Sequence, residues 1–211
     1  MRLIKFRHSC VRLESDGGVL VIDPGGFSER EALDGADAVL VTHEHADHLL
    51  VDAVVDEHAK RPELRVFAHA DVAPKLDAIA DAVTAVAPGD AFAAAGFEIR
   101  AYGGTHAQIH PDIPPVANLG YLVDGQVYHP GDSLHVPEET TVDTLLVPVS
   151  GPWLKASEAI EFMRAVAPRQ AIAIHDALYN DLGLGLVDRL FTQLGRTDFR
   201  RLASAEEVTI G

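Results

Sequence analysis

One short segment of this chain holds four side chains that commonly bind metal ions: His43, His45, Asp47 and His48. Successive side chains of extended backbone point to opposite sides, so His43, His45 and Asp47 can face one cavity. His48 comes three residues after His45, and a first helical turn would return it to the same side. Neutral imidazoles and a carboxylate suit zinc, iron, manganese or nickel. The segment therefore predicts a metal centre, and a histidine-rich helix cap with a solvated acid is the weaker interpretation.

The cluster lies between two apolar stretches. Residues 38–41 read as a buried strand of a layered α/β sheet, and residues 49–59 are compatible with a helix. The end of a strand, where a helix follows, is the usual place for site residues on open α/β sheets. With 11 histidines in 211 residues, chance would produce this pattern only on the order of 0.002–0.003 times. Coincidence is therefore a poor explanation of the cluster.

Four further metal-type residues share one local pattern, because each closes an apolar strand: Asp23, His106, Asp132 and His175. Strand ends converge on one rim of a layered sandwich, so these residues can meet the 43–48 cluster in space. A single histidine after a strand is more often a turn or core residue. Four such endings beside a ligand cluster favour a shared metal centre.

Composition is that of an ordinary globular protein. The chain is 47% hydrophobic and 23% charged, and 211 residues suit one domain, which we expect to span 1–211. Its one cysteine, Cys10, excludes an intramolecular disulfide and favours a reducing cytoplasm. The first residues lack the pattern of a signal peptide, and no apolar run approaches the ~20 residues that cross a bilayer. We expect a cytoplasmic protein that does not enter membranes.

The formal net charge is −15, which bears on partners. Long anionic polymers are repelled by such a field unless a local basic patch overcomes it. The densest pair of basic residues is Arg200–Arg201, near the C-terminus, and no basic cluster stands out. Nucleic acid is thus disfavoured as a substrate and a small molecule is favoured. The sequence leaves a homo-oligomer open.

The elements that position the metal-type residues can be read from apolar runs and turn residues. Asp16–Gly17–Gly18 predicts a hairpin turn. Helices are predicted at about 49–59, at 72–82, from an N-cap at Ser157 to Ala167, and near 184–195. Strands are expected at 2–7, 10–15, 19–23, 38–42, 65–68, 84–87, 91–93, 97–102, 118–123, 126–129, 145–148 and 170–174, with one short final strand. Strands dominate early and in the middle, and each half closes with βα units, which predicts two sheets with helices outside, an α/β sandwich.

Together these motifs resemble the metallo-β-lactamase fold superfamily. Residues 42–48 match its signature, and the other motifs lie at 21–25, 104–106, 129–133 and 174–176. The resemblance implies a four-layer αβ/βα sandwich and two divalent metal ions. One ion would be held by His43, His45 and His106, and the other by Asp47, His48 and His175. Asp132 would bridge the two ions, and Asp23 would orient ligands. True β-lactamases with two zincs commonly carry cysteine at the place of Asp132, so this chain resembles the non-lactamase hydrolases.

A narrower resemblance links residues 6–14, 118–121 and 128–132 to the L-ascorbate-6-phosphate lactonase-like branch of small metal-dependent hydrolases. Arg7 stands where that branch usually has glycine. The next residue, His8, matches a histidine that lies at the edge of the active site in that branch. The leaving group could be protonated by a metal-bound water or by a nearby imidazole. His8 is our first candidate for such an imidazole, with a structural histidine as the alternative. His110, His129 and His135 are weaker candidates of the same kind. Trp153 is expected either to wall the pocket or to pack in the core.

The resemblance implies a hydroxide held between two ions, zinc first and manganese, iron or nickel as alternatives. It would attack a small, anionic ester, lactone or phosphodiester, with His8, Asp47 and Asp132 as the catalytic side chains. Two other functions stay open. A nuclease is disfavoured by the charge and by the absence of a nucleic-acid-binding appendage. The other is a metal-binding or oxygen-chemistry protein without hydrolytic activity. Oxygen-reducing relatives usually carry altered ligands and a flavin domain, whereas this chain shows the full hydrolase ligand set and no such domain is expected.

Overall fold

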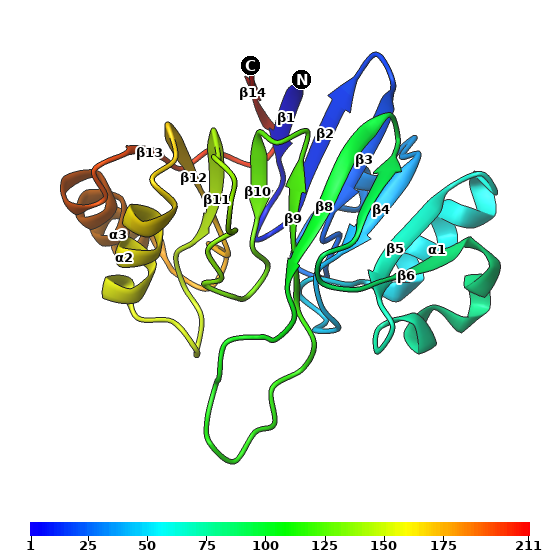
Figure 1. Cartoon of the computed structure of the whole chain (residues 1–211), viewed down its shortest axis with the longest axis horizontal. Coiled ribbons are helices and arrows are strands. Elements are labelled where there is room, and N and C mark those ends of the chain that lie inside the picture. The colour runs from blue at the N-terminus through cyan, green and yellow to red at the C-terminus, as the bar shows by residue number, and fades with distance from the viewer.

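The computed structural model describes residues 1–211 and contains two seven-stranded sheets packed face to face (Figure 1). The first sheet has the strand order β14-β1-β2-β3-β4-β5-β6. Its strands are β1 (Arg2–Lys5), β2 (Val11–Ser15), β3 (Gly18–Ile22), β4 (Ala38–Val41), β5 (Arg65–His69), β6 (Val83–Val86) and β14 (Glu206–Thr209). Strands β3 to β6 are parallel, so the loops after β3 and β4 leave the sheet at the same edge.

The second sheet has the order β13-β12-β11-β10-β9-β8-β7. Its strands are β7 (Ala91–Ala94), β8 (Phe97–Gly103), β9 (Leu119–Val123), β10 (Val127–His129), β11 (Thr144–Pro148), β12 (Gln170–Ile174) and β13 (Asp198–Arg200). Strands β10 to β13 are parallel. A long loop joins β8 to β9 and extends away from both sheets (Figure 1).

Three apolar layers separate four structural layers. Leu40 on β4 belongs to the core between the sheets, while its neighbours Val39 and Val41 belong to the core beneath the helices of the first sheet. This alternation follows from the two-residue period of a strand. The helix α1 (Val51–Lys60) lies outside the first sheet, and α2 (Ala156–Val166) and α3 (Asp181–Leu194) lie outside the second (Figure 1). The predicted four-layer αβ/βα sandwich is confirmed.

The helix predicted over 72–82 is present within one residue of that range, but it is not an α-helix. The segment Ala73–Ala82 is 3₁₀, and its backbone leaves helical values at Leu76 and Ile79. Its buried residues, Leu76, Ile79 and Ala82, recur every third residue. That spacing places the three side chains directly above one another on a 3₁₀ turn, whereas in an α-helix each would be offset from the last by about 60°. A further 3₁₀ turn, Arg30–Leu33, was not predicted.

Two helix starts also differ from the prediction. Helix α2 begins after Lys155, whose backbone N–H donates to the Glu158 carboxylate at 3.3 Å, so Ser157 lies inside the helix and does not cap it. Helix α3 begins at Asp181, because the Asn180 side chain accepts the Gly183 N–H at 3.0 Å and caps a start rich in glycine. Neither change moves a metal-type residue.

The two ends of the chain lie side by side (Figure 1). The final stretch forms two strands, β13 and β14, rather than the single one expected, and β14 pairs with β1 across Leu3 and Val208. None of the helices combines the length and apolar character needed to cross a membrane.

Candidate metal centre

Every residue predicted to bind metal lies in one cluster at the edge where the strand ends converge. The cluster divides into two groups, and within each group one ligand atom per residue lies within 4.8 Å of the others. The first group is His43, His45, His106 and Asp132, and the second is His8, Asp47, His48 and His175. Their loops follow β4, β8, β10 and β12, and His8 comes from the turn between β1 and β2. The fold thus joins residues up to 167 positions apart in the sequence.

Asp132 is the side chain that touches both groups. Its Oδ2 lies 3.4 Å from Nε2 of His106 and 3.0 Å from Nε2 of His175, and its Oδ1 lies 3.1 Å from Nε2 of His48. The loop carrying it is fixed by Asn118, whose Oδ1 accepts the Asp132 backbone N–H at 2.9 Å. A central carboxylate flanked by imidazoles from both sides is the arrangement that a bridging ligand requires.

Trp153 holds the same carboxylate from a third side. Its indole N–H donates to Oδ2 of Asp132 at 2.9 Å, and its ring meets those of His106 and His175 edge to face. The side chain is almost fully buried. The sequence alone does not decide whether Trp153 lines the pocket or packs in the core. It also does not predict this hydrogen bond, because nothing in the spacing of residues 132 and 153 indicates a contact.

The turn from His43 to His48 is shaped by close backbone contacts. The N–H groups of His48 and Leu49 both donate to the His45 carbonyl, at 3.0 and 2.9 Å, which folds the segment into a tight turn ahead of α1. Gly25 packs directly against this turn, since a Cβ at that position would lie 1.8 Å from the Asp47 carbonyl oxygen. A side chain at residue 25 would therefore displace Asp47.

Three site residues adopt the left-handed backbone conformation that favours glycine: His8 (φ 64°), Asp23 (φ 54°) and His175 (φ 56°). Each such non-glycine residue costs about 1–3 kcal/mol, a cost that surrounding structure must offset. A backbone hydrogen bond between two of these residues helps to offset the cost, because the His175 N–H donates to the His8 carbonyl at 3.1 Å. Strain of this kind is concentrated at functional sites.

Asp23 orients two histidines from beneath, as the resemblance implied. Its Oδ2 lies 2.6 Å from Nδ1 of His48 and accepts the Thr42 hydroxyl at 2.7 Å. Because the Thr42 hydroxyl donates to Asp23, its oxygen is free to accept from Nδ1 of His43, 3.0 Å away. Both imidazoles are therefore held through Nδ1, which leaves Nε2 directed into the cluster.

Several buried atoms of the cluster have no hydrogen-bond partner: Nε2 of His48, Nε2 of His106, Oδ1 of Asp132 and both ring nitrogens of His175. The other ring nitrogen of His106 already contacts the Ala107 carbonyl. Buried polar atoms without a partner are costly and rare in folded proteins. Lone pairs of imidazole nitrogen and carboxylate oxygen that converge in this way fit divalent metal ions, so the residues present suit the predicted cofactor.

Burial and charge shift the pKa values of the cluster's histidines in both directions, and burial lowers the pKa of His8 in the second group. Burial lowers the pKa of His43 and His45. Burial also acts to lower the pKa of His48 and of His175, but neighbouring carboxylates outweigh it. Asp132 and Asp23 raise the pKa of His48. Asp132 and Asp47 raise the pKa of His175. The pKa of Asp47 is lowered, because His175, His8 and His48 outweigh its burial.

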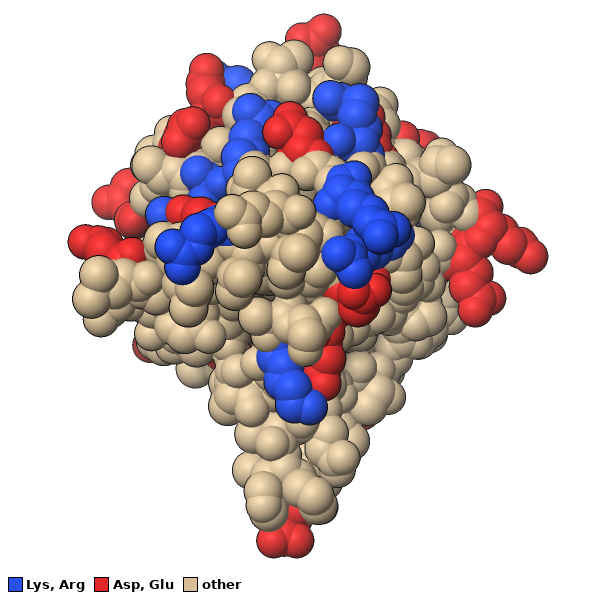
Figure 2. All heavy atoms as spheres, turned by 90° about the vertical axis from the view of Figure 1, so that its left-hand side faces the viewer, with Lys and Arg blue, Asp and Glu red and all other residues tan.

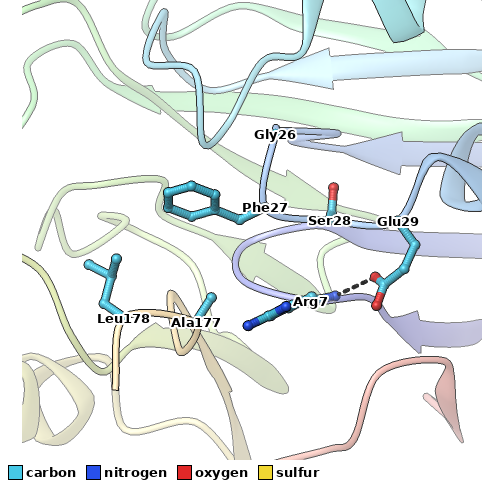
Figure 3. A pocket seen from close by; sticks show the side chains of 7 residues that line it. All are labelled: Arg7, Gly26, Phe27, Ser28, Glu29, Ala177 and Leu178. Carbon is cyan, nitrogen blue, oxygen red and sulfur yellow. Dashed lines mark hydrogen bonds between the residues drawn. The ribbon is translucent and has the colours of Figure 1, made fainter. Parts of the chain in front are cut away.

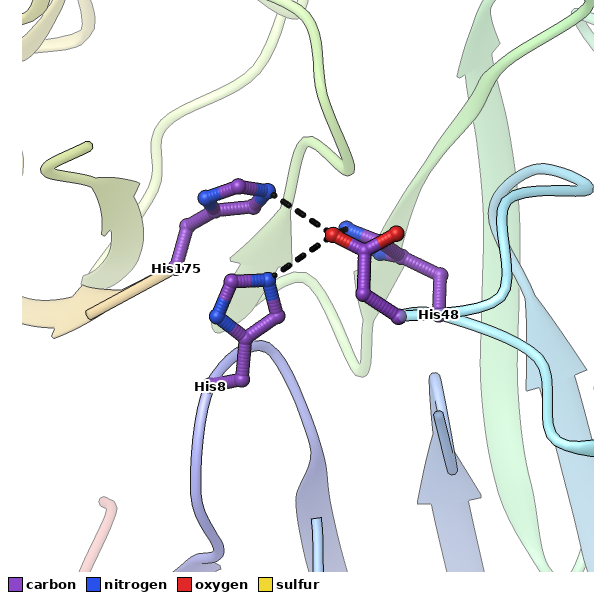
Figure 4. Close-up of side chains that lie close together, drawn as sticks. His8, His48 and His175 are labelled. Carbon is purple, nitrogen blue, oxygen red and sulfur yellow. Dashed lines mark hydrogen bonds and ion pairs between the residues drawn. The ribbon is translucent and has the colours of Figure 1, made fainter. Parts of the chain in front are cut away.

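His8 lies deeper than sequence reasoning placed it. Its side chain is fully buried, and Nδ1 accepts the Ala177 N–H at 3.4 Å, so Nε2 carries the proton and donates to Oδ2 of Asp47 at 3.1 Å. Figure 4 shows the rings of His8 and His175 directed at the same carboxylate oxygen. His8 is thus a neighbour of Asp47 in the second group and does not lie at an open edge.

The three weaker candidates for protonating the leaving group, His110, His129 and His135, are not members of the two groups. His110 is exposed on the β8–β9 loop beside Asp112. His135 lies against Tyr102. His129 is buried beneath the cluster, and since its Nδ1 accepts the Gly131 N–H, its Nε2 donates to the Ser9 carbonyl at 2.8 Å. Neither ring nitrogen of His129 is free to transfer a proton.

Comparison with known proteins agrees with this geometry. Residues 2–175 match the family model described as a beta-lactamase superfamily domain, a range that contains all the residues of both groups. The protein Rv0786c of Mycobacterium tuberculosis is 38% identical over 215 residues, covering 99% of this chain and all of that protein. A UPF0173 metal-dependent hydrolase of Thermoplasma acidophilum is 24% identical over 198 residues, covering 87% of this chain and 85% of its own length. Among solved structures, the metallo hydrolase Igni18 of the archaeon Ignicoccus hospitalis shares the fold at 22% identity, with a TM-score of 0.74 over 98% of this chain and 97% of that one.

Proposed function

This chain belongs to the metallo-β-lactamase superfamily, and we propose that it is a two-metal hydrolase of small anionic esters, lactones or phosphodiesters. A metal-dependent hydrolase agrees with the descriptions of the Thermoplasma and Ignicoccus proteins. The observation that carries the two-metal proposal is the position of Asp132, whose oxygens lie within 3.4 Å of His106, His175 and His48. One carboxylate shared by two groups of ligands supports two neighbouring ions.

The chain would hold the first ion with His43, His45 and His106 and the second with Asp47, His48 and His175, with Asp132 between them. Two such ions supply a water whose pKa falls toward ~7 and a positive charge that polarises the bond to be cleaved. In the overall reaction the water oxygen bonds to the acyl carbon or phosphorus, and the bond to the leaving oxygen breaks. The leaving oxygen takes up a proton.

His8 and Asp47 are the pair we assign to that proton. Asp47 is an ionised carboxylate because its pKa is lowered, so it would take the proton from the attacking water and pass it to the leaving oxygen. His8 is fully buried and donates to Asp47, whose side chain is 23% exposed. Asp47 is therefore the member of the pair that can face a substrate, and His8 positions it. Asp23 and Trp153 have the corresponding function for His48 and Asp132, because each fixes the orientation of its partner through a hydrogen bond.

Charge supports a small substrate rather than a nucleic acid. The chain carries −15, and the positive charge of two ions would act only near the cluster. On the face formed by α2 and α3, Lys and Arg side chains are interrupted by Asp, Glu and uncharged residues (Figure 2). Arg164, Arg169 and Arg201, for example, each pair with a carboxylate. A continuous basic track of the kind that follows a phosphate backbone does not form on this face.

The test is a hydrolysis panel with the full-length protein loaded separately with zinc, manganese, iron(II) or nickel. We expect turnover of 4-nitrophenyl acetate, a γ-lactone or bis(4-nitrophenyl) phosphate, and poor cleavage of structured RNA. Asp132→Ala should abolish turnover, whereas Asp112→Ala, on the exposed loop, should not. Efficient, salt-sensitive RNA cleavage would favour a nuclease, and metal binding without any turnover would favour a protein with no hydrolytic role.

A further inference from the structure

A cavity of about 460 Å³ opens beside the second metal group (Figure 3). Its walls come from the β1–β2 turn, from the loop after β3 and from the loop after β12. The residues that give it chemical character are Arg7, Phe27, Glu29, Ala177 and Leu178. We call it the Arg7 pocket.

One side chain, His8, separates the Arg7 pocket from the metal-type residues. The Phe27 ring meets the His8 ring edge to face, with centroids 5.1 Å apart, and Ala177 donates its N–H to the same imidazole. The opposite side of His8 contacts Asp47. A molecule seated in the pocket would therefore lie one residue away from the proposed reaction centre.

The pocket presents apolar surface and one free cation. Phe27 and Leu178 are 46% and 47% exposed, so both present apolar surface to a molecule in the pocket. The guanidinium of Arg7 is exposed and forms no ion pair or hydrogen bond with another residue. Figure 3 shows it directed away from Glu29, while the Arg7 backbone N–H donates to that carboxylate at 3.1 Å. Its charge is available to a ligand.

Glu29 limits which anion the pocket can accept. Both of its oxygens are occupied, one by the Arg7 backbone and the other by the Ser204 hydroxyl at 2.7 Å, so the carboxylate stays fixed in the wall. One guanidinium can pair with a monoanion, and the fixed negative charge of Glu29 disfavours the second charge of a phosphate dianion. The apolar walls favour an alkyl or aryl group next to that anion.

We propose that the Arg7 pocket binds a carboxylate at the end of an apolar arm of the substrate, so that the preferred substrates are esters or lactones of this kind. The inference rests on the proposed hydrolase function and names its substrate class. Arg7 would form a charge-assisted hydrogen bond with the carboxylate, and Phe27 and Leu178 would pack against the arm.

The test compares two esters that differ only at the far end of the acyl chain: 4-nitrophenyl hexanoate and the mono-4-nitrophenyl ester of hexanedioic acid. The measured quantity is the ratio of kcat/KM for the carboxylate ester to that for the neutral ester. Arg7→Ala should lower this ratio by about 10- to 100-fold, and Arg7→Lys should lower it less. Arg189→Ala removes an equal charge from an exposed position on α3 and should leave the ratio unchanged.

A binding measurement keeps this inference separate from the proposed function. Calorimetric titration of the metal-loaded protein with 4-phenylbutyrate should give a Kd about 10- to 100-fold weaker for Arg7→Ala than for wild type or Arg189→Ala. An equal Kd, or an equal ester ratio, in Arg7→Ala and wild type would overturn the inference even if both esters are hydrolysed. If no ester, lactone or phosphodiester is hydrolysed, the proposed function fails, and the phenylbutyrate titration still decides whether the pocket binds a carboxylate through Arg7.

Discussion

The indole N–H of Trp153 donates a hydrogen bond of 2.9 Å to Oδ2 of Asp132, the carboxylate that lies between the two groups of metal-type residues. The bond uses one lone pair of Asp132 and leaves Oδ1 without a hydrogen-bond partner. A tryptophan buried at this point therefore fixes which way the central carboxylate faces.

Replacing Trp153 by Phe tests this relationship. The phenyl ring keeps most of the apolar volume but cannot donate, so Asp132 loses one restraint. We expect metal affinity or activity to fall about 10- to 100-fold, as is usual when a hydrogen bond to a ligand is removed. Competition with a chromogenic chelator measures the affinity. Tyr102→Phe, which removes a hydroxyl without a hydrogen-bond partner, is the control. Equal affinities in both variants would show that Asp132 needs no support from Trp153.

His8→Ala should separate positioning from ligation. Removal of the imidazole deprives Asp47 of a donor at 3.1 Å but leaves the seven predicted ligands in place. We expect two metals to remain bound and kcat to fall, with the largest loss on esters with poor leaving groups, because protonation of the leaving oxygen is typically worth about 10²–10⁴ in rate. A series of leaving groups and an elemental analysis measure the two effects. Loss of one metal per chain would instead make His8 a ligand, which its place in the second group would allow.

Much of this centre could be predicted because its ligands stand at the ends of apolar strands. His106, Asp132 and His175 each follow such a strand, and the sheets bring those ends to one edge. The supporting contacts could not be predicted in the same way. The pairs Trp153–Asp132, Asn118–Asp132 and Ala177–His8 each join two different loops, and only the packed structure decides which side chains meet.

The fold shows the same division between local and tertiary information. The sequence shows residues 38–41 as an apolar strand. The two-residue period of a strand then places Leu40 in one core and Val39 and Val41 in the other. The 3₁₀ geometry at 73–82 is less visible, because a three-residue spacing of apolar side chains also fits part of an α-helical stripe. The packing of Leu76, Ile79 and Ala82 in the core decides the helix type, and that packing cannot be read from the sequence.

Gly25→Ala should damage the centre without changing any ligand. The added Cβ would lie 1.8 Å from the Asp47 carbonyl oxygen, and a backbone atom cannot move aside cheaply. We expect a lower melting temperature and weaker binding of the metal held by Asp47 and His48. Gly185→Ala is the matched control, because its Cβ meets nothing within 4 Å and alanine favours the helix by roughly 0.5–1 kcal/mol. Thermal denaturation with and without metal gives both quantities, and a Gly25→Ala protein as stable as Gly185→Ala would contradict the close contact.

Acidification should release the two metals in order. Metal binding requires neutral imidazoles, and the pKa values of His48 and His175 are raised, whereas those of His43 and His45 are lowered. As pH falls, protons therefore compete first for His48 and His175, above the ordinary histidine value of about 6.5, and for His43 and His45 only below it. Dialysis at stepped pH followed by metal analysis should show one equivalent lost before the other. Simultaneous loss, or retention of both at pH 5, would show that the groups do not differ in this way.

The central claim is that the two groups hold two ions around Asp132, and the most direct measurement is metal stoichiometry. Elemental analysis of metal-replete protein, together with calorimetric titration of the metal-free chain, should give two divalent ions per chain. Asp132→Ala should weaken both sites, because its carboxylate approaches His106 on one side and His48 and His175 on the other. Saturation at one ion, with Asp132→Ala binding that ion as tightly as wild type, would contradict the account.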